Sequence, residues 1–326
     1  MNFLIKNIIK FPIHYLYTGE KYLTDCSKNL AIDYTDKTLP SYINRETIIC
    51  MFDGKLKHGG LADRLRGIIS MYYYSKLHNL DFKIYHIYPF ELSVFLCPNR
   101  YDWRIDRSEL CFNPSISKPL FVASADYFLE NSLTKRFLKK NIRNYKQYHV
   151  YPSIKIGDKV FKECFHELFI PSPLLKDSIK RILYDINDKF ITISFRFVEL
   201  LGDFHDTIKH TLPDNKKEIL IQKCLLAISK IRKEAPEHNK VVITSDSKTF
   251  LHRAKSLPNV YLIPGELGHV DYKENLNIHL KTFTDFFIIS HAEKSYMVRT
   301  KEMYKSGFAQ RACMVNNTPF EEYIIG

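Results

Sequence analysis

The stretch KHGGLADRLRGI, at residues 57–68, decides how this sequence is read. It follows the apolar, β-branched run TIICMF at residues 47–52 and opens a segment of helical periodicity that extends to residue 78. A strand, a glycine turn and a helix in this order aim backbone N–H groups and the positive end of a helix dipole at an anion. The stretch lacks the Gly-Lys-Ser/Thr ending of a P-loop, so it does not indicate hydrolysis of ATP or GTP. A lone Gly-Gly pair also occurs where a strand simply turns into a helix, so motifs elsewhere must decide.

Length and composition indicate a globular enzyme. The chain has 326 residues, enough for two domains with sizeable cores, and 45% of the residues are hydrophobic while 26% are charged. The net charge of +12 suits nucleic acid, an anionic membrane surface or a phosphorylated substrate. The basic residues are spread over most segments, and the densest group, at residues 135–146, fits a solvated helix face. Charge alone therefore selects none of these partners.

Cysteine spacing and the N-terminal segment favour a cytosolic protein. The 7 cysteines form no Cys-x-x-Cys pair, which argues for reduced thiols and against a zinc site or a disulfide framework. Lys6, Lys10 and Pro12 interrupt the apolar N-terminus, which falls short of the roughly 20 residues of a spanning helix. No small-residue cleavage site follows, so a signal peptide is not expected. The segment would lie on a membrane surface or pack on the protein body.

The first half of the chain predicts an α/β domain. Residues 1–45 are expected to form a helical arm, followed by a βαβ unit with strands at 47–52 and 81–86. Further expected elements are strands at 119–123 and 148–151, a basic helix at 126–146 and a helix at 158–168. We place the domain boundary near Ser172, in a proline-rich turn, which divides the chain into 1–172 and 173–326.

The second half predicts a doubly wound parallel sheet, because strands and helices alternate along it. The expected strands are 189–197, 241–245, 260–263, 295–298 and 313–315. The expected helices are 218–235, 248–256, 279–290 and 306–311. Ligands of such sheets bind beyond the carboxyl ends of the strands. The polar residues at these ends are Arg196, Glu199, Ser245, Asp246, Arg299 and Thr300.

Arg196 is the first candidate, because it lies in an otherwise apolar run between Phe195 and Phe197. A guanidinium there requires a buried anion or a carboxylate. The acidic and histidine residues that follow are Glu199, Asp203, His205 and Asp206. The segment is therefore either a structural Arg–carboxylate pair or a phosphate clamp, and a metal cluster of its carboxylates and histidine is a further alternative.

Two other strand ends carry candidate groups. Asp246 lies in the sequence TSDS, where it would cap the next helix or accept hydrogen bonds from a ribose or a base. The sequence SGFA at residues 306–309 opens a further helix with a small-residue turn, which is a second candidate phosphate site.

Together these motifs resemble the fucosyltransferase superfamily of GT-B glycosyltransferases, which includes bacterial α-1,2- and α-1,6-fucosyltransferases and protein O-fucosyltransferases. GGLADR at 59–64 is similar to the family's Gly-Gly-Leu-Gly-Asn-Arg/Gln turn. Ser194-Phe195-Arg196 is similar to its His-x-Arg-x-Gly-Asp strand end, with Gly202-Asp203 displaced along the chain. TSD at 244–246 and SGFA at 306–309 are similar to its Thr-Asp-Asp strand end and its Ser-x-Phe-Ser helix start. The sequence departs from the family pattern at Asp63, Ser194 and Ala309, where Asn, His and Ser are usual.

The resemblance implies a GT-B-like α/β fold, with two Rossmann-like doubly wound domains facing across a cleft. Residues 1–172 would form the acceptor-side domain, including the arm 1–45, and residues 173–326 would bind the nucleotide sugar. The implied activity is inverting, metal-independent transfer of fucose from GDP-fucose to a sugar hydroxyl. The acceptor would be a surface polysaccharide or oligosaccharide, made in a bacterial cytoplasm or at the inner face of the membrane.

The resemblance also implies roles for individual residues. Arg196 would bind the β-phosphate as GDP leaves, and Asp246 would contact the guanosine. An inverting transfer needs a base, for which Glu199 is favoured over Asp203. Because the chain has no Asp-x-Asp pair, and arginine and helix ends would neutralise the diphosphate, no metal and no cofactor are expected. The residues expected to bind the donor are Gly59, Gly60, Asp63, Arg64, Ser194, Arg196, Asp246, Ser306, Gly307 and Phe308.

Three alternatives stay open from the sequence. The chain could use another nucleotide-sugar donor on the same fold, or bind glycans without catalysis because several motif positions are substituted. It could instead be a basic nucleic-acid-binding protein, but the basic residues do not cluster and no aromatic-basic motif occurs.

Overall fold

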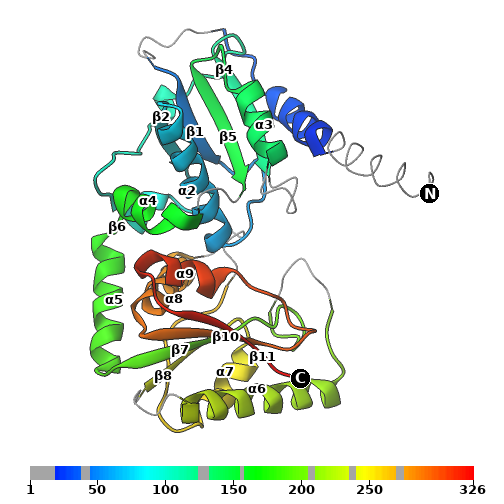
Figure 1. Ribbon diagram of the computed structural model, residues 1–326, viewed down its shortest axis with the longest axis vertical. Helices are drawn as coiled ribbons and strands as arrows, with labels where there is room; N and C mark the ends of the chain where they lie inside the picture. The colour runs from blue at the N-terminus through cyan, green and yellow to red at the C-terminus, as the bar shows by residue number, and fades with distance from the viewer. Residues whose placement is uncertain are drawn as a thin grey trace, which may run out of the picture. The chain divides into compact units, whose positions relative to one another are not determined.

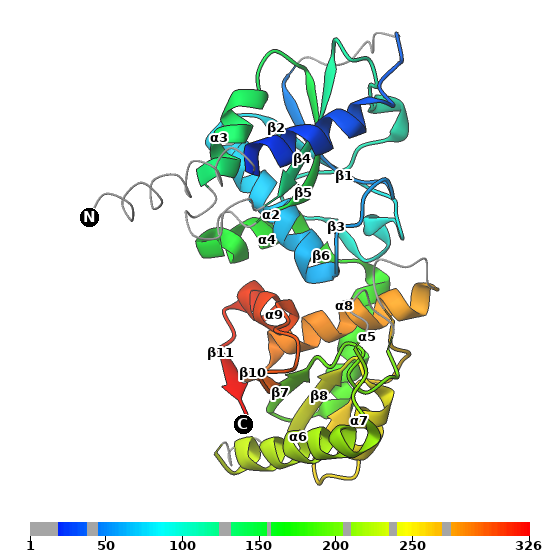
Figure 2. The ribbon, with the colours of Figure 1, turned by 90° about the vertical axis from the view of Figure 1, so that its right-hand side faces the viewer.

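The chain forms two compact units, shown in Figures 1 and 2. The computed structural model describes residues 19–37, 45–123, 132–154, 158–204, 210–234, 240–268 and 275–326. The first unit comprises Met1–His58, Asp63–Tyr88 and Pro98–Leu168. The second comprises Gly59–Ala62, Pro89–Cys97 and Phe169–Gly326. Each unit is built on a parallel β-sheet with helices, which confirms the predicted α/β fold class.

The first unit is organised by a four-stranded parallel sheet with the strand order β2-β1-β5-β4. Its strands are β1 (Thr47–Phe52), β2 (Asp81–His86), β4 (Ser117–Ala123) and β5 (Gln147–Ser153). β1 is an interior strand, and its residues from Ile48 to Phe52 are all buried. An interior parallel strand favours an unbroken apolar run, which is why TIICMF predicted this strand correctly.

The helices of the first unit pack closely on its sheet. α2 (Leu61–Leu77) connects β1 to β2 as predicted, α3 (Ser132–Asn141) precedes β5, and α4 (Phe161–Leu168) follows it. A Cβ atom added to Gly67 of α2 would lie 3.0 Å from the carbonyl oxygen of Pro152, so a glycine is required at this approach. Residues 124–131, the first part of the predicted basic helix, lie outside the described residues. No helix among the described residues is long and apolar enough to cross a membrane.

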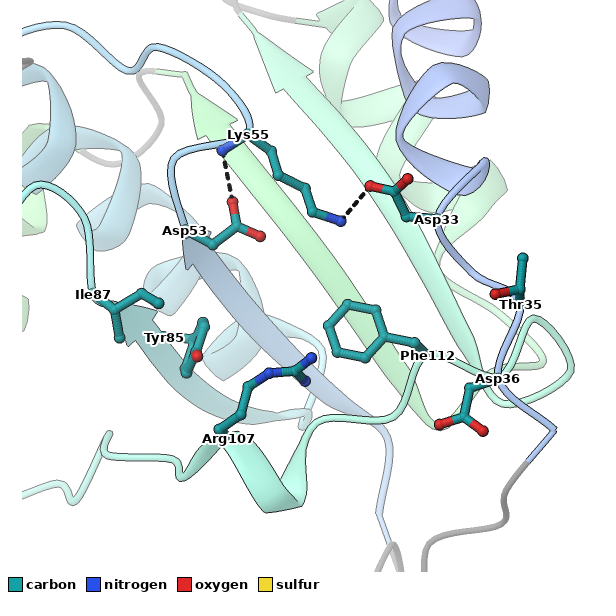
Figure 3. Close-up of a pocket in the computed structure, with 9 residues that line it drawn as sticks. All are labelled: Asp33, Thr35, Asp36, Asp53, Lys55, Tyr85, Ile87, Arg107 and Phe112. Atoms are coloured by element: carbon teal, nitrogen blue, oxygen red, sulfur yellow. Dashed lines mark hydrogen bonds and ion pairs between the residues drawn. The ribbon is translucent and has the colours of Figure 1, made fainter.

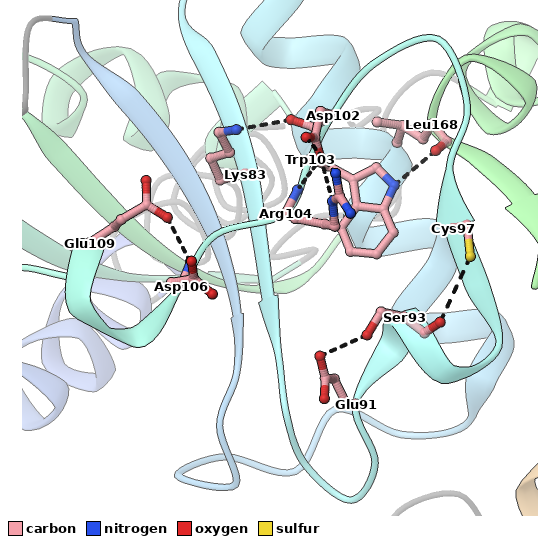
Figure 4. Close-up of polar contacts among 10 residues, drawn as sticks. All are labelled: Lys83, Glu91, Ser93, Cys97, Asp102, Trp103, Arg104, Asp106, Glu109 and Leu168. Carbon is pink, nitrogen blue, oxygen red and sulfur yellow. Dashed lines mark hydrogen bonds and ion pairs between the residues drawn. The ribbon is translucent and has the colours of Figure 1, made fainter.

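Side-chain hydrogen bonds organise the segment between β2 and β4, whose sequence shows no clear periodicity (Figure 4). The indole Nε1 of Trp103 donates to the carbonyl oxygen of Leu168 at 2.8 Å. The guanidinium of Arg104 donates two hydrogen bonds of 2.9 Å to the carboxylate of Asp102. The segment's short elements are the 3₁₀ helices η1 (Leu92–Val94) and η2 (Arg107–Glu109), and β3 (Leu96–Pro98), which pairs with β6 (Phe169–Pro171).

The second unit is organised by a five-stranded parallel sheet with the strand order β11-β10-β7-β8-β9. Its strands are β7 (Phe190–Phe195), β8 (Lys240–Ser245), β9 (Val260–Leu262), β10 (Lys294–Arg299) and β11 (Phe320–Ile324). Its helices are α5 (Pro173–Ile186), α6 (Asp214–Glu234), α7 (Lys248–Ala254), α8 (Leu276–His291) and α9 (Phe308–Asn316). α6 and α7 contribute to the core on one face of the sheet, and Figure 1 shows α8 and α9 on the other. Helices on both faces make this a doubly wound sheet, as predicted.

The predicted strand at 313–315 is wrong, because these residues belong to α9. Cys313 and Val315 are buried together with Ala309 and Ala312, which gives the segment the spacing of a helix face rather than a strand. The C-cap of this helix is Asn317, which has a left-handed backbone conformation and donates its N–H to the carbonyl oxygen of Cys313. The last strand is instead β11, which pairs with β10. Its sequence FEEYI carries two charges and is only partly buried, as expected for a strand at the edge of the sheet.

The helix α8 carries a buried ion pair. The Nζ atom of Lys281 contacts both carboxylate oxygens of Asp285, one helical turn further along. The two side chains are only 7% and 13% exposed. Burial raises the pKa of Asp285, and the ammonium of Lys281 opposes this by stabilising the charged carboxylate. Each charge therefore depends on the other.

Removing one member of this pair should be more harmful than removing both. We expect Lys281→Met to lower the free energy of unfolding by about 3 kcal/mol, because Asp285 is left buried without a counter-ion. The double variant Lys281→Met/Asp285→Leu should recover most of this loss. Urea denaturation at pH 7 measures both, and equal destabilisation by the single and double variants would contradict the prediction.

A buried hydrogen-bonded chain holds the N-terminal side of the first unit on β5. The hydroxyl of Tyr34 lies 2.6 Å from His149 Nδ1, and His149 Nε2 lies 2.9 Å from Gln147 Oε1. The amide oxygen of Gln147 can only accept, so Nε2 of His149 donates to it. The neutral ring then accepts the hydrogen of the Tyr34 hydroxyl at Nδ1. Burial, with smaller contributions from Lys55 and Arg107, lowers the pKa of His149 to about 3.

His149 should make the protein less stable in mild acid. Below its usual pKa of 6.5, the unfolded chain binds a proton on His149 that the folded chain excludes, so stability is lost as the pH falls from 6.5 toward 3. Between pH 7 and pH 5 the native chain should lose about 2 kcal/mol more than a His149→Gln variant. Urea titrations at both pH values measure this difference. An identical slope for the native chain and His149→Gln would refute the assignment.

Candidate functional site

The winding of the second sheet reverses beside β7. The chain passes from β7 to β8 and β9 on one side, and then crosses to β10 and β11 on the other. In open α/β sheets, ligands bind outside the carboxyl ends of the strands that flank such a reversal. The residues that follow β7 and β10 are therefore the first to consider, and Arg196 follows β7 directly.

Arg196 is held by a carboxylate at the end of the neighbouring strand. Its Nη1 atom lies 3.2 Å from Oδ2 of Asp246, and its guanidinium lies 4.8 Å from the centre of the Phe204 ring. The side chain of Arg196 is 23% exposed, whereas that of Asp246 is only 4% exposed. The Arg–carboxylate pair weighed from the sequence is thus present, and part of the Arg196 side chain remains open to solvent. A phosphate clamp remains compatible with this geometry.

Asp246 also holds the turn that follows β7. Its Oδ1 accepts the N–H of Phe197 at 2.9 Å, and its Oδ2 accepts the N–H of Val198 at 2.7 Å. Val198 has a φ of +56°, a left-handed conformation that β-branched residues rarely adopt. Burial raises the pKa of Asp246, and Arg196 together with these two N–H groups opposes the rise. The carboxylate thus stabilises a strained turn through both oxygen atoms and fixes Arg196 through Oδ2.

The helix cap considered for Asp246 is supplied by its neighbour. The hydroxyl oxygen of Ser247 accepts the N–H of Phe250 at 3.0 Å and so caps α7. Oδ2 of Asp203 accepts hydrogen bonds from the Ser247 hydroxyl at 2.8 Å and from the N–H of Thr249 at 2.7 Å. Asp203, a candidate base from the sequence, therefore also anchors the first turn of α7.

The remaining candidates near β7 have distinct surroundings. Glu199 is half-buried in the turn after Val198, and its carbonyl oxygen accepts the N–H of Gly202 at 3.0 Å. The hydroxyl of Ser194 lies 2.8 Å from that of Thr244 on β8. His205 and Asp206 lie outside the described residues. Within the described ranges, no group of three or more His, Cys, Asp or Glu side chains could hold a metal ion.

The start of α9 offers backbone N–H groups. The hydroxyl oxygen of Ser306 accepts the N–H of Phe308 at 3.2 Å, and Gly307 is the N-cap without a side-chain hydrogen bond. A Cβ atom added to Gly307 would meet no atom within 4 Å, so packing does not require a glycine there. The backbone at this turn is open to an approaching anion.

Glu322 is a residue of this region that the sequence analysis missed. Its Oε1 accepts from Nε of Arg299 at 2.6 Å, and its Oε2 accepts from Nζ of Lys305 at 2.6 Å. The two cations lower the pKa of Glu322, with the Lys305 hydrogen bond as the largest cause. Arg299 ends β10, so Glu322 holds cationic groups on the other side of the winding reversal from Arg196. No sequence signal placed Glu322 beside Arg299, because β11 and its pairing with β10 were not predicted.

The segment at residues 57–68 is divided between the two units: Gly59–Ala62 belong to the second, and the residues on either side belong to the first. Gly59 has a φ of +75°, which favours glycine, and a Cβ atom added to Gly60 would meet no atom within 4 Å. Asp63 pairs with Arg66 at 3.0 Å. Arg64 is 2% exposed, and its Nη1 lies 3.3 Å from Nε2 of His86 and 3.2 Å from the carbonyl oxygen of Tyr88. These contacts place Arg64 in the interior of the first unit.

Comparison with solved structures shows similarity to fucosyltransferases. The fucosyltransferase NodZ from Bradyrhizobium matches with a TM-score of 0.57 and 13% identity, over 83% of this chain and 93% of that chain. A mutant of FUT1 from Arabidopsis thaliana in complex with GDP matches with a TM-score of 0.53 and 13% identity, over 96% of this chain and 78% of that chain. POFUT1 in complex with GDP matches with a TM-score of 0.50 and 10% identity, over 87% and 99%. No protein-family model and no curated protein matches the sequence.

These matches establish the fold of the chain. At 10–13% identity they confirm that its parallel α/β architecture is that of GT-B fucosyltransferase structures, as the motifs predicted. The residues that would carry the activity are assigned from the geometry described above.

Asp246 should be essential for the order of this site. Asp246→Ala leaves two buried N–H groups and a guanidinium without their acceptor, so we expect the free energy of unfolding to fall by about 3 kcal/mol. Asp246→Asn keeps an acceptor oxygen and should lose about half as much. Urea denaturation measures both, with Asp177→Asn on the exposed face of α5 as the control, for which a change within about 0.5 kcal/mol is expected. Stability equal to the native chain for Asp246→Ala would show that the carboxylate does not hold the turn.

Proposed function

We propose that this chain is a glycosyltransferase that moves fucose from GDP-fucose to a hydroxyl of a glycan. One observation carries the proposal, namely a guanidinium fixed by a buried carboxylate at the carboxyl end of β7, where the sheet reverses its winding. The fold in which it occurs is shared with fucosyltransferase structures, two of which are described as complexes with GDP. GDP-fucose is therefore the donor to test first.

The second unit would stabilise the departure of GDP. As the glycosidic bond breaks, negative charge develops on the β-phosphate, and pre-positioned cations and N–H groups lower the energy of that state. Arg196 would contact the β-phosphate, and the turn at residues 306–308, where the Phe308 N–H is held by the Ser306 hydroxyl, would present the N–H groups of Ser306 and Gly307 to the pyrophosphate. Because both kinds of group are fixed before the reaction, this arrangement would work without a metal ion. Asp246 would act by positioning Arg196, since its oxygen atoms are already engaged.

An inverting transfer also needs a group that takes the proton of the acceptor hydroxyl. We favour Glu199, which is half-buried and follows Arg196 in the same turn. Asp203 is the second candidate, but its Oδ2 is engaged by the first turn of α7. A Glu199→Gln variant that still binds GDP would separate a role in proton transfer from a role in donor binding.

The cellular setting that we propose is the cytoplasm, in the synthesis of a surface polysaccharide or oligosaccharide. α3 buries Leu133 and Phe137, and its exposed positions include Lys135, Arg136, Lys139 and Lys140. Such a face would allow weak contact with the anionic inner surface of a membrane. Transfer from another nucleotide sugar on the same fold is the alternative that the experiment below separates from GDP-fucose.

Binding of GDP in the presence of EDTA tests this function. We expect GDP and GDP-fucose to raise the melting temperature without added metal, and UDP- and CMP-sugars to have no effect. Arg196→Ala should weaken GDP binding by about tenfold to a hundredfold, because a charge-assisted contact is lost. Arg196→Lys keeps the positive charge beside Asp246 and serves as a second variant in case Arg196→Ala is poorly folded. Arg181→Ala, on the exposed face of α5, should bind GDP like the native chain.

Two results would contradict the proposal. If only a UDP-sugar stabilised the protein, GDP-fucose would not be the donor. If binding strictly required Mn²⁺, the proposed metal-independent mechanism based on Arg196 would be wrong. Release of GDP from GDP-fucose, measured with and without an added oligosaccharide, then reports whether transfer follows binding.

A further inference from the structure

A pocket of about 620 Å³ lies in the first unit, at the carboxyl ends of β1 and β2 (Figure 3). Asp53 and Lys55 follow β1, and Tyr85 and Ile87 come from the end of β2 and the residue after it. Arg107 and Phe112 reach the pocket from η2 and the loop that follows it. All of the described residues that line the pocket belong to the first unit.

The position of the pocket follows the rule for parallel sheets. The chain passes from β1 to β2 on one side and returns through β4 to β5 on the other, so the winding reverses beside β1. Asp53 and Lys55 directly follow the strand at this reversal. Open α/β sheets bind ligands at such a reversal, which here lies between β1 and β5, and the pocket is next to it at the ends of β1 and β2.

Asp53 is held in a defined orientation by buried groups. Its Oδ2 accepts the hydroxyl of Tyr151 at 2.9 Å, and its Oδ1 accepts the N–H of Lys55 at 3.1 Å. Tyr151 is fully buried, and its pKa is raised by burial and by the nearby charge of Asp53. Each carboxylate oxygen keeps a second lone pair that can accept a hydrogen bond from a ligand.

The charges of the pocket do not suit a phosphate. Its carboxylates are Asp33, Asp36 and Asp53, against the two cations Lys55 and Arg107. Lys55 is paired with Asp33, with 2.6 Å between Nζ and Oδ2. Arg107 lies with its guanidinium 4.5 Å from the centre of the Phe112 ring, and its N–H groups donate to no other described residue. A nucleotide or another polyanion would meet an excess of negative charge here.

We propose that this pocket binds a neutral sugar residue of the acceptor glycan. The assignment of that sugar as an acceptor depends on the proposed function, but the binding itself does not. A sugar presents hydroxyls that both donate and accept, alternating with apolar C–H surface. Asp53 accepts from such hydroxyls, Arg107 donates to them, and Tyr85, Ile87 and Phe112 supply apolar contact.

The proposal is tested by sugar binding to the full chain without nucleotide. The probes are the methyl glycosides of glucose, galactose, mannose and N-acetylglucosamine, followed by ligand-observed NMR titration. We expect saturable binding of at least one of them, weakened about tenfold by Arg107→Ala and by Asp53→Asn, since each removes a charged hydrogen-bonding group. Arg107 is exposed and holds no buried group in place, so its replacement should not affect folding.

The same unit offers a matched control pair. Arg104, like Arg107, is an exposed arginine in the segment between β2 and β4, and it pairs with the exposed Asp102 outside the pocket (Figure 4). Arg104→Ala and Asp102→Asn should leave sugar binding unchanged. Equal weakening by the control pair and the pocket pair would overturn the assignment of the site.

Parallel titrations with GDP and with inorganic phosphate separate this inference from the proposed function. Loss of GDP binding in Arg196→Ala with sugar binding intact would support two independent sites. Sugar binding without any GDP binding would show that GDP-fucose is not the donor, and would still support the pocket as a sugar-binding site. Saturable binding of none of the glycosides, or displacement of the sugar by phosphate, would overturn the pocket proposal.

Discussion

The carboxylate of Asp246 holds together the chain leaving β7 and the cation at its end. Its two oxygen atoms accept the N–H groups of Phe197 and Val198 and pair with Arg196. Val198 occupies a backbone region that its branched side chain disfavours, so the turn persists only because the surroundings hold it there. The position of Arg196 therefore depends on a residue that is itself almost inaccessible to a ligand. Asp246 therefore both holds the strained backbone at Val198 and positions the charge of Arg196.

The two units follow the same topological rule. In each, the winding of a parallel sheet reverses beside an interior strand, and polar side chains gather after that strand. In the second unit Arg196 pairs with Asp246, and Arg299 and Lys305, at the end of β10, pair with Glu322, so each of these cations has a carboxylate partner. The pocket of the first unit is lined by three carboxylates and two cations. The net charge of +12 describes neither of these local arrangements.

The sequence predicted those parts of the fold whose signals are local. TIICMF and FITISF are interior strands with nearly continuous apolar runs, so periodicity and composition were sufficient. β11 escaped prediction because an edge strand such as FEEYI needs no apolar run, and Glu322, which lies in this strand, escaped with it. Arg196 and Asp246 were found one by one as strand-end residues. Their pairing was not predicted, because 49 residues separate Asp246 from the N–H of Phe197 that it accepts. The segment around Trp103 depends on hydrogen bonds to distant carbonyl groups, which periodicity does not report.

The pairing of β11 with β10 has a consequence for the order in which the second unit assembles. Glu322 lies on the last strand of the chain, and it engages Arg299 and Lys305. β11 is added to the sheet beside β10, so its residues find their partners only after the neighbouring strand is available. During synthesis the ribosome delivers β7 and β8 long before β11, and the interior strands can pair while the edge position is still vacant. The cationic end of β10 therefore receives its carboxylate from a segment that is synthesised after the other four strands of this sheet.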